Sequence, residues 1–524
     1  MAEIFDQNQQ RAVELTSQYR AVMEQVGRTL WARPEVGLEE YHSAALLIDL
    51  FRREGFRVTA GIGGFPTGFV AEFGQGGPVA AILCEYDALP NLSTTNPGAN
   101  GHGCGHNLFA AAAVGTALVL RDVLKEGTVS GTIRVYGTPG EENYASKAYY
   151  VNQGLMDDVD FSVGFHAHDE NKVNYTVSAG TLTKSYTFHG KPAHAGNYPW
   201  LGNSALDAVE LMNVACNYLR EHVPTDVRIQ YIITKGGDAP NIVPEIAQSL
   251  YVVRAACRAT MDGVADRVDD CARAAALATG CTVDIDYVDR TYNTVLLREY
   301  AELAQKHLDA VGAPAFTQEE LENARQYGDG SGLHQQITPL PWAEGYQGGA
   351  TDEGDVSWIM PHVSIYVSNV ARNTPGHTLQ MTAQGNCSAA YTAMETQVKA
   401  ISTMILDLFE HPQMVETLKA AHEKKLAGDR YPKNPSYWPD PKAFLNCQGV
   451  EISGQEITAD FSQLILLPES FSGQVTVEKD GAVAASFTGS GSASSQIPLA
   501  EGDSLTVVAV SADGSRQLIG YWNL

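Results

Sequence analysis

Side chains that bind metals are concentrated in a glycine-rich segment, 101–107, which reads Gly-His-Gly-Cys-Gly-His-Asn. The thiolate of Cys104 and the imidazoles of His102 and His106 suit zinc and related transition metals, because soft sulfur and borderline nitrogen match a borderline cation. The alternative interpretation is a buried cysteine beside a helix-capping histidine, which is a common fate of such residues. Taken alone, the segment is consistent with either structure.

A pair of adjacent carboxylates, Glu141 and Glu142, follows the turn 137–140. One of them could bind a metal while the other stays free as a general base. By itself such a pair is more often a solvated surface pair. Asp87, which follows another strand-like run, could orient a ligating imidazole through a hydrogen bond.

Three more histidines could reach the same metal. His166 and His168 are separated by one residue, and alternate residues of an extended backbone point the same way. His377 lies in a turn much later in the chain, where a lone histidine is more often structural. The alternative for each is a buried histidine whose nitrogens are satisfied by hydrogen bonds.

The pattern of helices and strands places these groups together. Apolar, strand-like runs end just before the acidic and histidine residues, at 79–83, 132–136 and 161–165. Helical segments alternate with them, which predicts a mostly parallel, mixed α/β sheet. Ligands of such sheets bind at the carboxyl ends of the strands. A cysteine, several histidines and a glutamate pair at one sheet edge therefore favour a metal-dependent active site.

The element pattern also predicts several domains. Between 181 and 290 it changes to β-α-β-β-α-β, and a proline-rich stretch later interrupts all regular structure. Short β-rich runs follow, among them 464–467 and 504–511. The predicted division is a catalytic domain in two parts, 1–180 and 291–427, an inserted ferredoxin-like α+β domain, 181–290, a linker, 428–445, and a small all-β domain, 446–524.

Composition excludes several classes of protein. The 524 residues are 44% hydrophobic and 18% charged, which is typical of a soluble globular chain. A net charge of -26 disfavours nucleic acid and anionic membranes as partners. The apolar run 108–120 is too short to span a bilayer and is expected to be a buried helix. The first 31 residues lack a secretory signal pattern, and the eight scattered cysteines predict reduced thiols, so a cytoplasmic location is expected.

Over residues 15–425 the chain resembles the M20-type metallopeptidases and amidohydrolases, in particular the branch with aminobenzoyl-glutamate hydrolases and M20-domain dipeptidases. The order and number of the matching motifs make the resemblance specific. These motifs are Arg33-Pro34-Glu35-Val36-Gly37 with Glu39-Glu40, Glu85-Tyr86-Asp87-Ala88-Leu89-Pro90, Gly101 to Asn107, Gly140-Glu141-Glu142, Gly190-Lys191-Pro192-Ala193-His194-Ala195, Asn241-Ile242-Val243-Pro244, Gly354-Asp355-Val356-Ser357-Trp358 and Pro375-Gly376-His377.

The resemblance implies a site for two divalent metal ions, with Zn²⁺ favoured and Mn²⁺ or Co²⁺ as alternatives. The implied ligands are Cys104, His106, Glu142, His166 and His377. Glu141 is implied as general base and Asp87 as a further residue of the catalytic site. Many M20 enzymes have a metal-binding histidine where this chain has Glu85, which leaves open whether Glu85 or His168 joins the ligands.

The resemblance also implies that residues 181–290 form a lid and dimerisation domain of a homodimer. His194 is then expected to reach the active site of the neighbouring subunit, where it would stabilise the oxyanion that develops during the reaction. Asn241 and Arg254 are expected to contact the substrate. Since the chain is acidic, an anionic substrate needs local cations, for which Arg254 and Lys191 are the candidates.

The implied reaction is hydrolysis of the amide bond of a small N-acyl amino acid or dipeptide, such as an aminobenzoyl-glutamate or a β-alanyl or lysyl dipeptide. A metal-activated water would attack the carbonyl and Glu141 would act as the base. Two alternatives stay open. One is a non-catalytic metal- or peptide-binding protein on the same fold, and the other is a thiol hydrolase with Cys104 as nucleophile.

Overall fold

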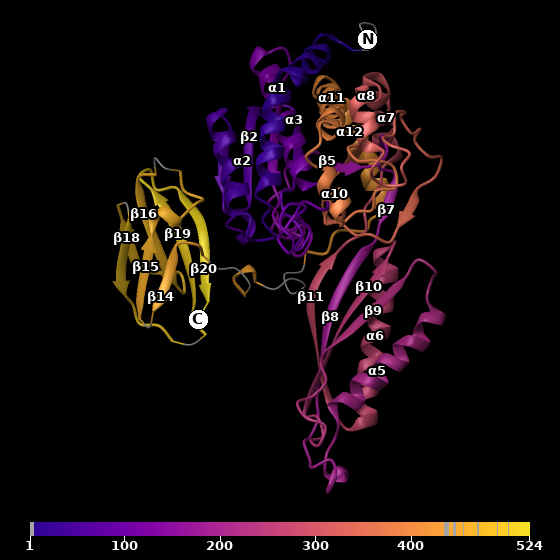
Figure 1. Cartoon of the computed structure of the whole chain (residues 1–524), viewed down its shortest axis with the longest axis vertical. Coiled ribbons are helices and arrows are strands. Elements are labelled where there is room, and N and C mark those ends of the chain that lie inside the picture. The colour runs from indigo at the N-terminus through magenta and orange to yellow at the C-terminus, as the bar shows by residue number, and fades with distance from the viewer. Residues whose placement is uncertain are drawn as a thin grey trace.

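The computed structural model describes residues 5–433, 440–443, 447–453, 455–468, 471–489, 491–500 and 502–523. These residues form an α/β body, an elongated α+β body that projects from it, and a β body at its side (Figure 1). Residues 434–439 and 444–446 of the expected linker lie outside the described residues.

A seven-stranded mixed sheet organises the α/β body, in the order β1-β2-β4-β3-β5-β13-β6. Its strands are β1 (Arg57–Ala60), β2 (Phe69–Gln75), β3 (Val79–Cys84), β4 (Gly131–Gly137), β5 (Phe161–His168), β6 (Lys172–Val173) and β13 (His362–Ser368). The parallel pairs are confined to the central strands β4, β3, β5 and β13, and the edge pairs are antiparallel. The carboxyl ends of the central strands therefore meet at one edge.

Helices cover this sheet. They are α1 (Gln7–Ala32), α2 (Tyr41–Arg53), α3 (His106–Glu126), α4 (Ser146–Asn152), α7 (Arg298–Val311), α8 (Gln318–Ala324), α9 (Glu353–Ser357), α10 (Leu379–Gln384), α11 (Ser388–Glu410) and α12 (Pro412–Leu426). Helix α3 is rich in alanine and packs against α1, α11 and β5. Among the described residues it is the one helix long and apolar enough to cross a membrane, and 89% of that stretch is buried inside the protein.

Shorter elements lie within the bodies and between them. They include the parallel pair β7 (Thr176–Ser178) and β12 (Gly345–Gln347), and the 3₁₀ helices η1 (Ile62–Gly64), η2 (Pro199–Leu201), η3 (Arg220–His222), η5 (Pro441–Ala443) and η6 (Phe461–Gln463). Strand β7 lies directly before the inserted chain segment and β12 follows it in the chain. The hydroxyl of Tyr346 on β12 donates to the carbonyl of Asp226 in the inserted segment at 2.9 Å, so this pair lies where the two larger bodies meet.

The projecting body, called the inserted domain below, has the β-α-β-β-α-β element order. Its elements are β8 (Gly180–His189), α5 (Ala205–Leu219), β9 (Arg228–Lys235), β10 (Ile246–Ala255), α6 (Arg258–Thr279) and β11 (Thr282–Thr291). The antiparallel sheet has the order β11-β8-β10-β9. Both helices pack on one face and bury apolar residues such as Val209, Met212 and Val268. The opposite face of the sheet is uncovered at the strand ends nearest the α/β body. There it faces the candidate site residues across a cavity.

The β body has two antiparallel sheets, in the orders β14-β15-β18 and β17-β16-β19-β20. Its strands are β14 (Val450–Ser453), β15 (Glu456–Asp460), β16 (Gly473–Lys479), β17 (Ala482–Thr488), β18 (Ser492–Gln496), β19 (Ser504–Ser511) and β20 (Arg516–Asn523). The strand expected over 464–467 is wrong: a turn follows η6 there, and Leu464 and Leu466 are buried from the turn. The hydroxyl of Tyr521 donates to the carbonyl of Gly64 at 3.1 Å, which joins this body to the α/β body.

Candidate metal centre

A tight turn sets Cys104 and His106 on either side of Gly105. Gly105 has φ +86°, a left-handed conformation, and it directly precedes α3. A Cβ atom at this position would lie 2.7 Å from the Cβ of Ala167 on β5, so only glycine fits. The turn therefore packs closely against the strand that carries His166.

Asp87 fixes the orientation of His106. Its Oδ1 lies 2.8 Å from Nδ1 of His106, and its Oδ2 accepts a hydrogen bond of 3.0 Å from the backbone N–H of Glu142. Burial opposes the ionisation of Asp87, but the charge of His106 and these hydrogen bonds outweigh it and keep the pKa of the carboxyl below its ordinary value. The arrangement turns Nε2 of His106 away from Asp87, as a metal ligand requires.

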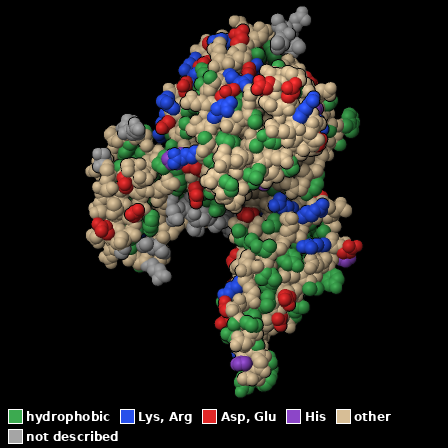
Figure 2. Space-filling model, in the orientation of Figure 1, with side chains coloured by type: hydrophobic (Ala, Val, Ile, Leu, Met, Phe, Trp, Pro, Cys, Tyr) green, Lys and Arg blue, Asp and Glu red, His purple; other side chains and the backbone are tan. Residues whose placement is uncertain are grey.

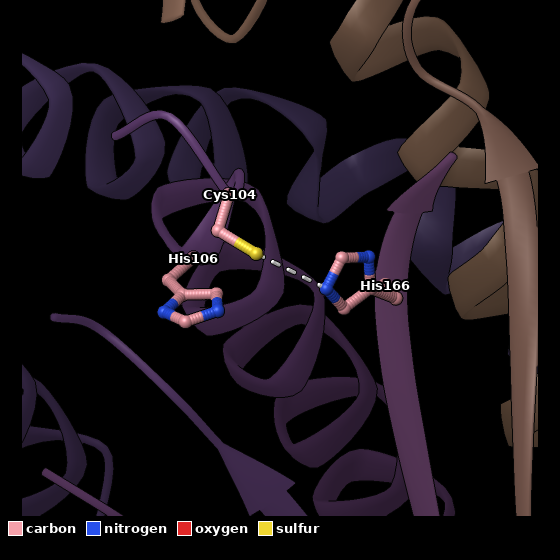
Figure 3. A group of neighbouring side chains, drawn as sticks. All are labelled: Cys104, His106 and His166. Atoms are coloured by element: carbon pink, nitrogen blue, oxygen red, sulfur yellow. Dashed lines mark hydrogen bonds between the residues drawn. The ribbon is translucent and has the colours of Figure 1, made fainter. Parts of the chain in front are cut away.

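The five expected ligands form two overlapping groups. In the first, Sγ of Cys104 lies 3.4 Å from Nε2 of His166, with His106 beside them (Figure 3). In the second, Cys104 is joined by Glu142 and His377, whose Oε1 and Nε2 atoms are 3.4 Å apart. In each group the ligand atoms lie within 4.8 Å of one another. Two cations could thus share Cys104.

The donor atoms fit divalent cations. Nε2 of His106 and Oε1 of Glu142 are buried and make no hydrogen bond with a described residue, although Glu85 and His377 lie within ion-pair distance of them. A sulfur, three imidazoles and a carboxylate suit zinc-like ions. Burial and the charge of His106 lower the pKa of His166 to about 4, which keeps its imidazole neutral. Burial raises the pKa of Cys104 to about 12, so a bound cation has to displace the thiol proton.

The two adjacent glutamates face different groups. Glu142 faces Cys104 and His377, whereas Glu141 lies with Glu85 and His106 in a third group of atoms within 4.8 Å. The structure gives the carboxylate of Glu141 no hydrogen bond or ion pair with a described residue. Burial, followed by the charge of Glu85, raises the pKa of Glu141 well above its ordinary value. Glu141 is therefore available to exchange a proton.

The sequence did not point to a buried ion cluster behind the ligands. The ammonium of Lys147, on α4, lies 2.7 Å from Glu85 and 2.5 Å from Asp352, and the three side chains are almost fully buried. Oε2 of Glu85 is 3.2 Å from Nε2 of His106. The sequence feature that could have indicated this cluster is the single lysine in the apolar run 145–151.

Of the two residues left open as extra ligands, only Glu85 lies in a group that could hold a metal. His168 instead lies 2.8 Å from a carboxylate oxygen of Asp169, and its ring stacks on Tyr366.

A cavity of about 580 Å³ separates this centre from the inserted domain. Glu141, Glu142 and His377 line one side, and Arg254 with neighbouring residues of the inserted sheet lines the other. Nη1 of Arg254 donates to the carbonyl of Gly348 at 3.3 Å, while its buried Nε has no hydrogen-bond partner among the described residues. The guanidinium can therefore still donate hydrogen bonds to a carboxylate.

His194 and Asn241 do not line this cavity, and neither does Lys191. They lie near each other beyond the far end of β8, where the backbone N–H of Ala195 donates to the carbonyl of Asn241 at 3.0 Å. His189, at the end of β8, lies six positions beyond the cavity-lining Thr183, a distance of about 20 Å along a strand.

Comparisons with known proteins place the chain in a family. Residues 81–444 match the peptidase family M20/M25/M40. The chain is 34% identical to one of the subunits of p-aminobenzoyl-glutamate hydrolase from Escherichia coli, over 75% of this chain and 90% of that protein. It is 31% identical to Xaa-Arg dipeptidase of Mus musculus, over 79% and 92%. A dinuclear metal binding peptidase of the M20 family from Bacillus subtilis shares the fold, with a TM-score of 0.54 and 16% identity over 75% and 99%.

Proposed function

The chain belongs to peptidase family M20/M25/M40 and is a hydrolase of amide bonds, and from this premise we propose that it cleaves small N-acyl amino acids or dipeptides at a two-metal centre. The observation that carries the proposal is the pair of ligand groups that share Cys104 beside the unpaired Glu141. Related proteins that act on p-aminobenzoyl-glutamate and on Xaa-Arg dipeptides support this substrate range.

The residues of the candidate metal centre have separate roles in the proposed reaction. Cys104, His106, Glu142, His166 and His377 would hold two divalent ions, with Zn²⁺ favoured over Mn²⁺ and Co²⁺. Bound ions of this kind polarise a carbonyl and lower the pKa of water. Asp87 keeps the imidazole of His106 in position. Glu141 takes the proton of the attacking water and returns it to the departing amine, so that it ends the cycle unchanged.

The inserted domain binds the substrate from the other side of the cavity. Arg254 is the cation placed to hold a substrate carboxylate, because guanidinium groups recognise carboxylates through paired hydrogen bonds. A domain that closes over the cavity would also exclude water and act as a lid.

We further propose a homodimer in the cytoplasm, in which His194 and Asn241 complete the site of the neighbouring subunit. In their own chain both lie beyond the far end of β8, about 20 Å along the strand from the cavity, which supports this proposal. The inserted domain also exposes apolar side chains, including Tyr218 on α5 at 75% and Ile232 on the edge strand β9 at 60%, and hydrophobic surface is visible along this domain in Figure 2. An exposed helix beside an unpaired edge strand suits pairing with a second copy about a two-fold axis.

The replacement Glu141→Gln tests the hydrolase mechanism. It removes the base and keeps the shape of the side chain, so we expect kcat to fall at least a hundredfold while the bound metal, measured by elemental analysis, stays at the wild-type level. Loss of metal would mean that the roles of Glu141 and Glu142 were exchanged. Unchanged turnover would favour a mechanism without this base, such as nucleophilic attack by Cys104.

A further inference from the structure

Two buried carboxyl groups fix the backbone on either side of Glu141. Oε1 of Glu40 accepts a hydrogen bond of 2.7 Å from the backbone N–H of Gly140, which directly precedes the proposed base. Oδ2 of Asp87 accepts one of 3.0 Å from the N–H of Glu142, which directly follows it. Glu40 and Asp87 are 0% and 1% exposed. The two acids thus hold the backbone N–H groups of both neighbours of Glu141.

The side chain of Glu141 supplies no anchor of its own. Its carboxylate makes no hydrogen bond or ion pair with a described residue, so its position follows from the backbone that carries it. Gly140 sets the direction of this backbone with φ +64°, a left-handed conformation that favours glycine. The carbonyl of Gly140 accepts hydrogen bonds of 2.8 and 3.0 Å from the N–H groups of Tyr144 and Ala145. Its N–H donates to Glu40, so this carboxyl completes the hydrogen bonding of the residue that orients the base.

The chain between α1 and α2 approaches this turn closely. A Cβ atom at Gly37 would lie 2.9 Å from the Cα of Gly140, so only glycine fits there. The carbonyl of Glu35 accepts a hydrogen bond of 2.7 Å from the N–H of Ala88, the neighbour of Asp87. This segment therefore contacts both stretches of chain that place acids beside the metal centre.

A local role does not account for the carboxyl of Glu40. The residue is the N-cap of α2, but its side chain makes no capping hydrogen bond. Glu35 caps this helix instead, because its carboxylate accepts hydrogen bonds of 3.1 and 2.8 Å from the N–H groups of His42 and Ser43. The second oxygen of Glu40 accepts a bond of 3.2 Å from the hydroxyl of Thr67, and the carboxyl forms no ion pair with a described residue.

The position of this carboxyl is unfavourable for its charge. Burial, followed by the charge of Asp87, raises the pKa of Glu40 well above its ordinary value, and the backbone N–H groups that contact it offset this effect only in part. An apolar side chain of similar size would be buried at lower cost. What the carboxyl provides in exchange is an acceptor for the N–H of Gly140.

We infer that Glu40 is a positioning residue for the general base: it fixes the turn at Gly140 from which Glu141 projects, and it does not touch the substrate. The inference rests on the proposed amide hydrolysis, in which Glu141 is the base, and adds a second acid on which that base depends. A displacement of a reacting group by about 1 Å can cost about a hundredfold in rate. Loss of Glu40 should therefore lower kcat and leave KM and metal content unchanged.

Glu40→Leu and Glu40→Gln test the inference in the full-length, metal-loaded protein, with p-aminobenzoyl-glutamate and β-alanyl-lysine as substrates. Leucine removes the acceptor for the N–H of Gly140, so we expect kcat to fall about tenfold to a hundredfold. Glutamine keeps an acceptor oxygen at this place and should restore most of kcat. Glu40→Met replaces the leucine variant if that protein does not fold. Loss of bound metal in the apolar variants would show that Glu40 acts on the ligand Glu142, which contradicts the inference.

Thr67→Val is the matched control. It removes the other hydrogen bond of the same buried carboxyl and leaves the bond to Gly140 in place. This variant should keep the kcat of the wild type, even where urea unfolding shows a lower stability. A fall in kcat as large as that in Glu40→Leu would show a general disturbance of this region and overturn the inference.

A double-mutant cycle with Glu141→Gln separates positioning from a general structural effect. If Glu40 acts through the base, then adding Glu40→Leu to Glu141→Gln lowers the residual turnover no further. The residual turnover is measured at high enzyme concentration. An equal fold-loss in both backgrounds would mean that Glu40 acts independently of Glu141, and the inference would be wrong.

Crystal structures separate a failure of the inference from a failure of the proposed function. In metal-loaded Glu40→Leu the turn 139–142 should be displaced relative to the wild type, while Cys104 and His166 stay in place. A displaced turn supports the role of Glu40 even if the wild type hydrolyses neither substrate. An unchanged turn overturns the inference even if hydrolysis is observed.

Discussion

Asp87 and His106 are joined by a contact of 2.8 Å between Oδ1 and Nδ1, and both side chains are buried. This contact leaves Nε2 as the only ring nitrogen of His106 that can bind a metal. We therefore expect Asp87→Asn to weaken metal binding about tenfold to a hundredfold. Competition with a coloured chelator measures this affinity. The control is Asp286→Asn, which changes an aspartate of β11 that does not line the cavity. Unchanged affinity would show that the imidazole is held by packing alone.

Removal of the metal should abolish activity and leave the fold intact. A chelator is expected to reduce turnover to background, and Zn²⁺, Mn²⁺ or Co²⁺ added in turn should restore it to different extents. Circular dichroism should not change, because the ligands are held by the protein framework. Activity that survives complete metal removal would support Cys104 as the nucleophile.

Lys147 is expected to matter for stability. Lys147→Met would leave Glu85 and Asp352 buried without their shared cation, which costs about 3–5 kcal/mol for a broken buried pair. Urea unfolding measures the loss. Adding Glu85→Gln and Asp352→Asn to this variant should recover part of it, because no buried charge is then unpaired. A loss below about 1 kcal/mol would contradict a structural role of the cluster.

Asp355 should make the protein less stable as the pH rises. Burial raises the pKa of Asp355 to about 8, and its carboxyl contacts the hydroxyl of Tyr431 at 2.8 Å. The unfolded chain loses this proton near pH 4, so the folded state binds more protons between about pH 4 and 8. The stabilising contribution is therefore complete below pH 4 and disappears as the pH rises through 8.

The variant Asp355→Asn isolates this effect. Its free energy of unfolding, measured in urea between pH 5 and 8, should fall less steeply with rising pH than that of the wild type. The two slopes should differ by up to about 1.4 kcal/mol per pH unit. Parallel curves for the two proteins would mean that Asp355 is ionised in the fold.

Mixed dimers test whether His194 acts in the neighbouring subunit. Subunits with His194→Ala are mixed with subunits that carry Glu141→Gln, each inactive alone. If His194 serves the partner, each mixed dimer holds one intact site, and random exchange should recover about a quarter of wild-type activity. If His194 serves its own chain, every site carries one lesion and mixing recovers nothing.

The clustering of candidate ligands at one sheet edge could be predicted from the sequence, whereas the full set of candidate ligands came only from the family resemblance. His166 lies near the carboxyl end of β5 and Glu142 lies in the turn after β4, and parallel strands bring such ends together. Contacts across long sequence distances could not be found in this way. Lys147 meets Asp352 over 205 residues, and no local pattern links them. The place of Asp289 in the lining of the cavity could not be predicted either, because a one-residue bulge in β11 changes the face of this residue without changing the strand-like composition.

The close approach of Gly105 to Ala167 has a consequence for how ions arrive. Because this contact packs the turn with Cys104 tightly against β5, Sγ of Cys104 and the imidazole of His166 are already adjacent before a cation binds. Metal binding then requires no rearrangement of these ligands, in contrast to zinc fingers, whose chains fold only when the ion binds. Ion exchange between metals of similar radius should accordingly proceed without unfolding, so the cellular supply of metals can decide which one the enzyme carries.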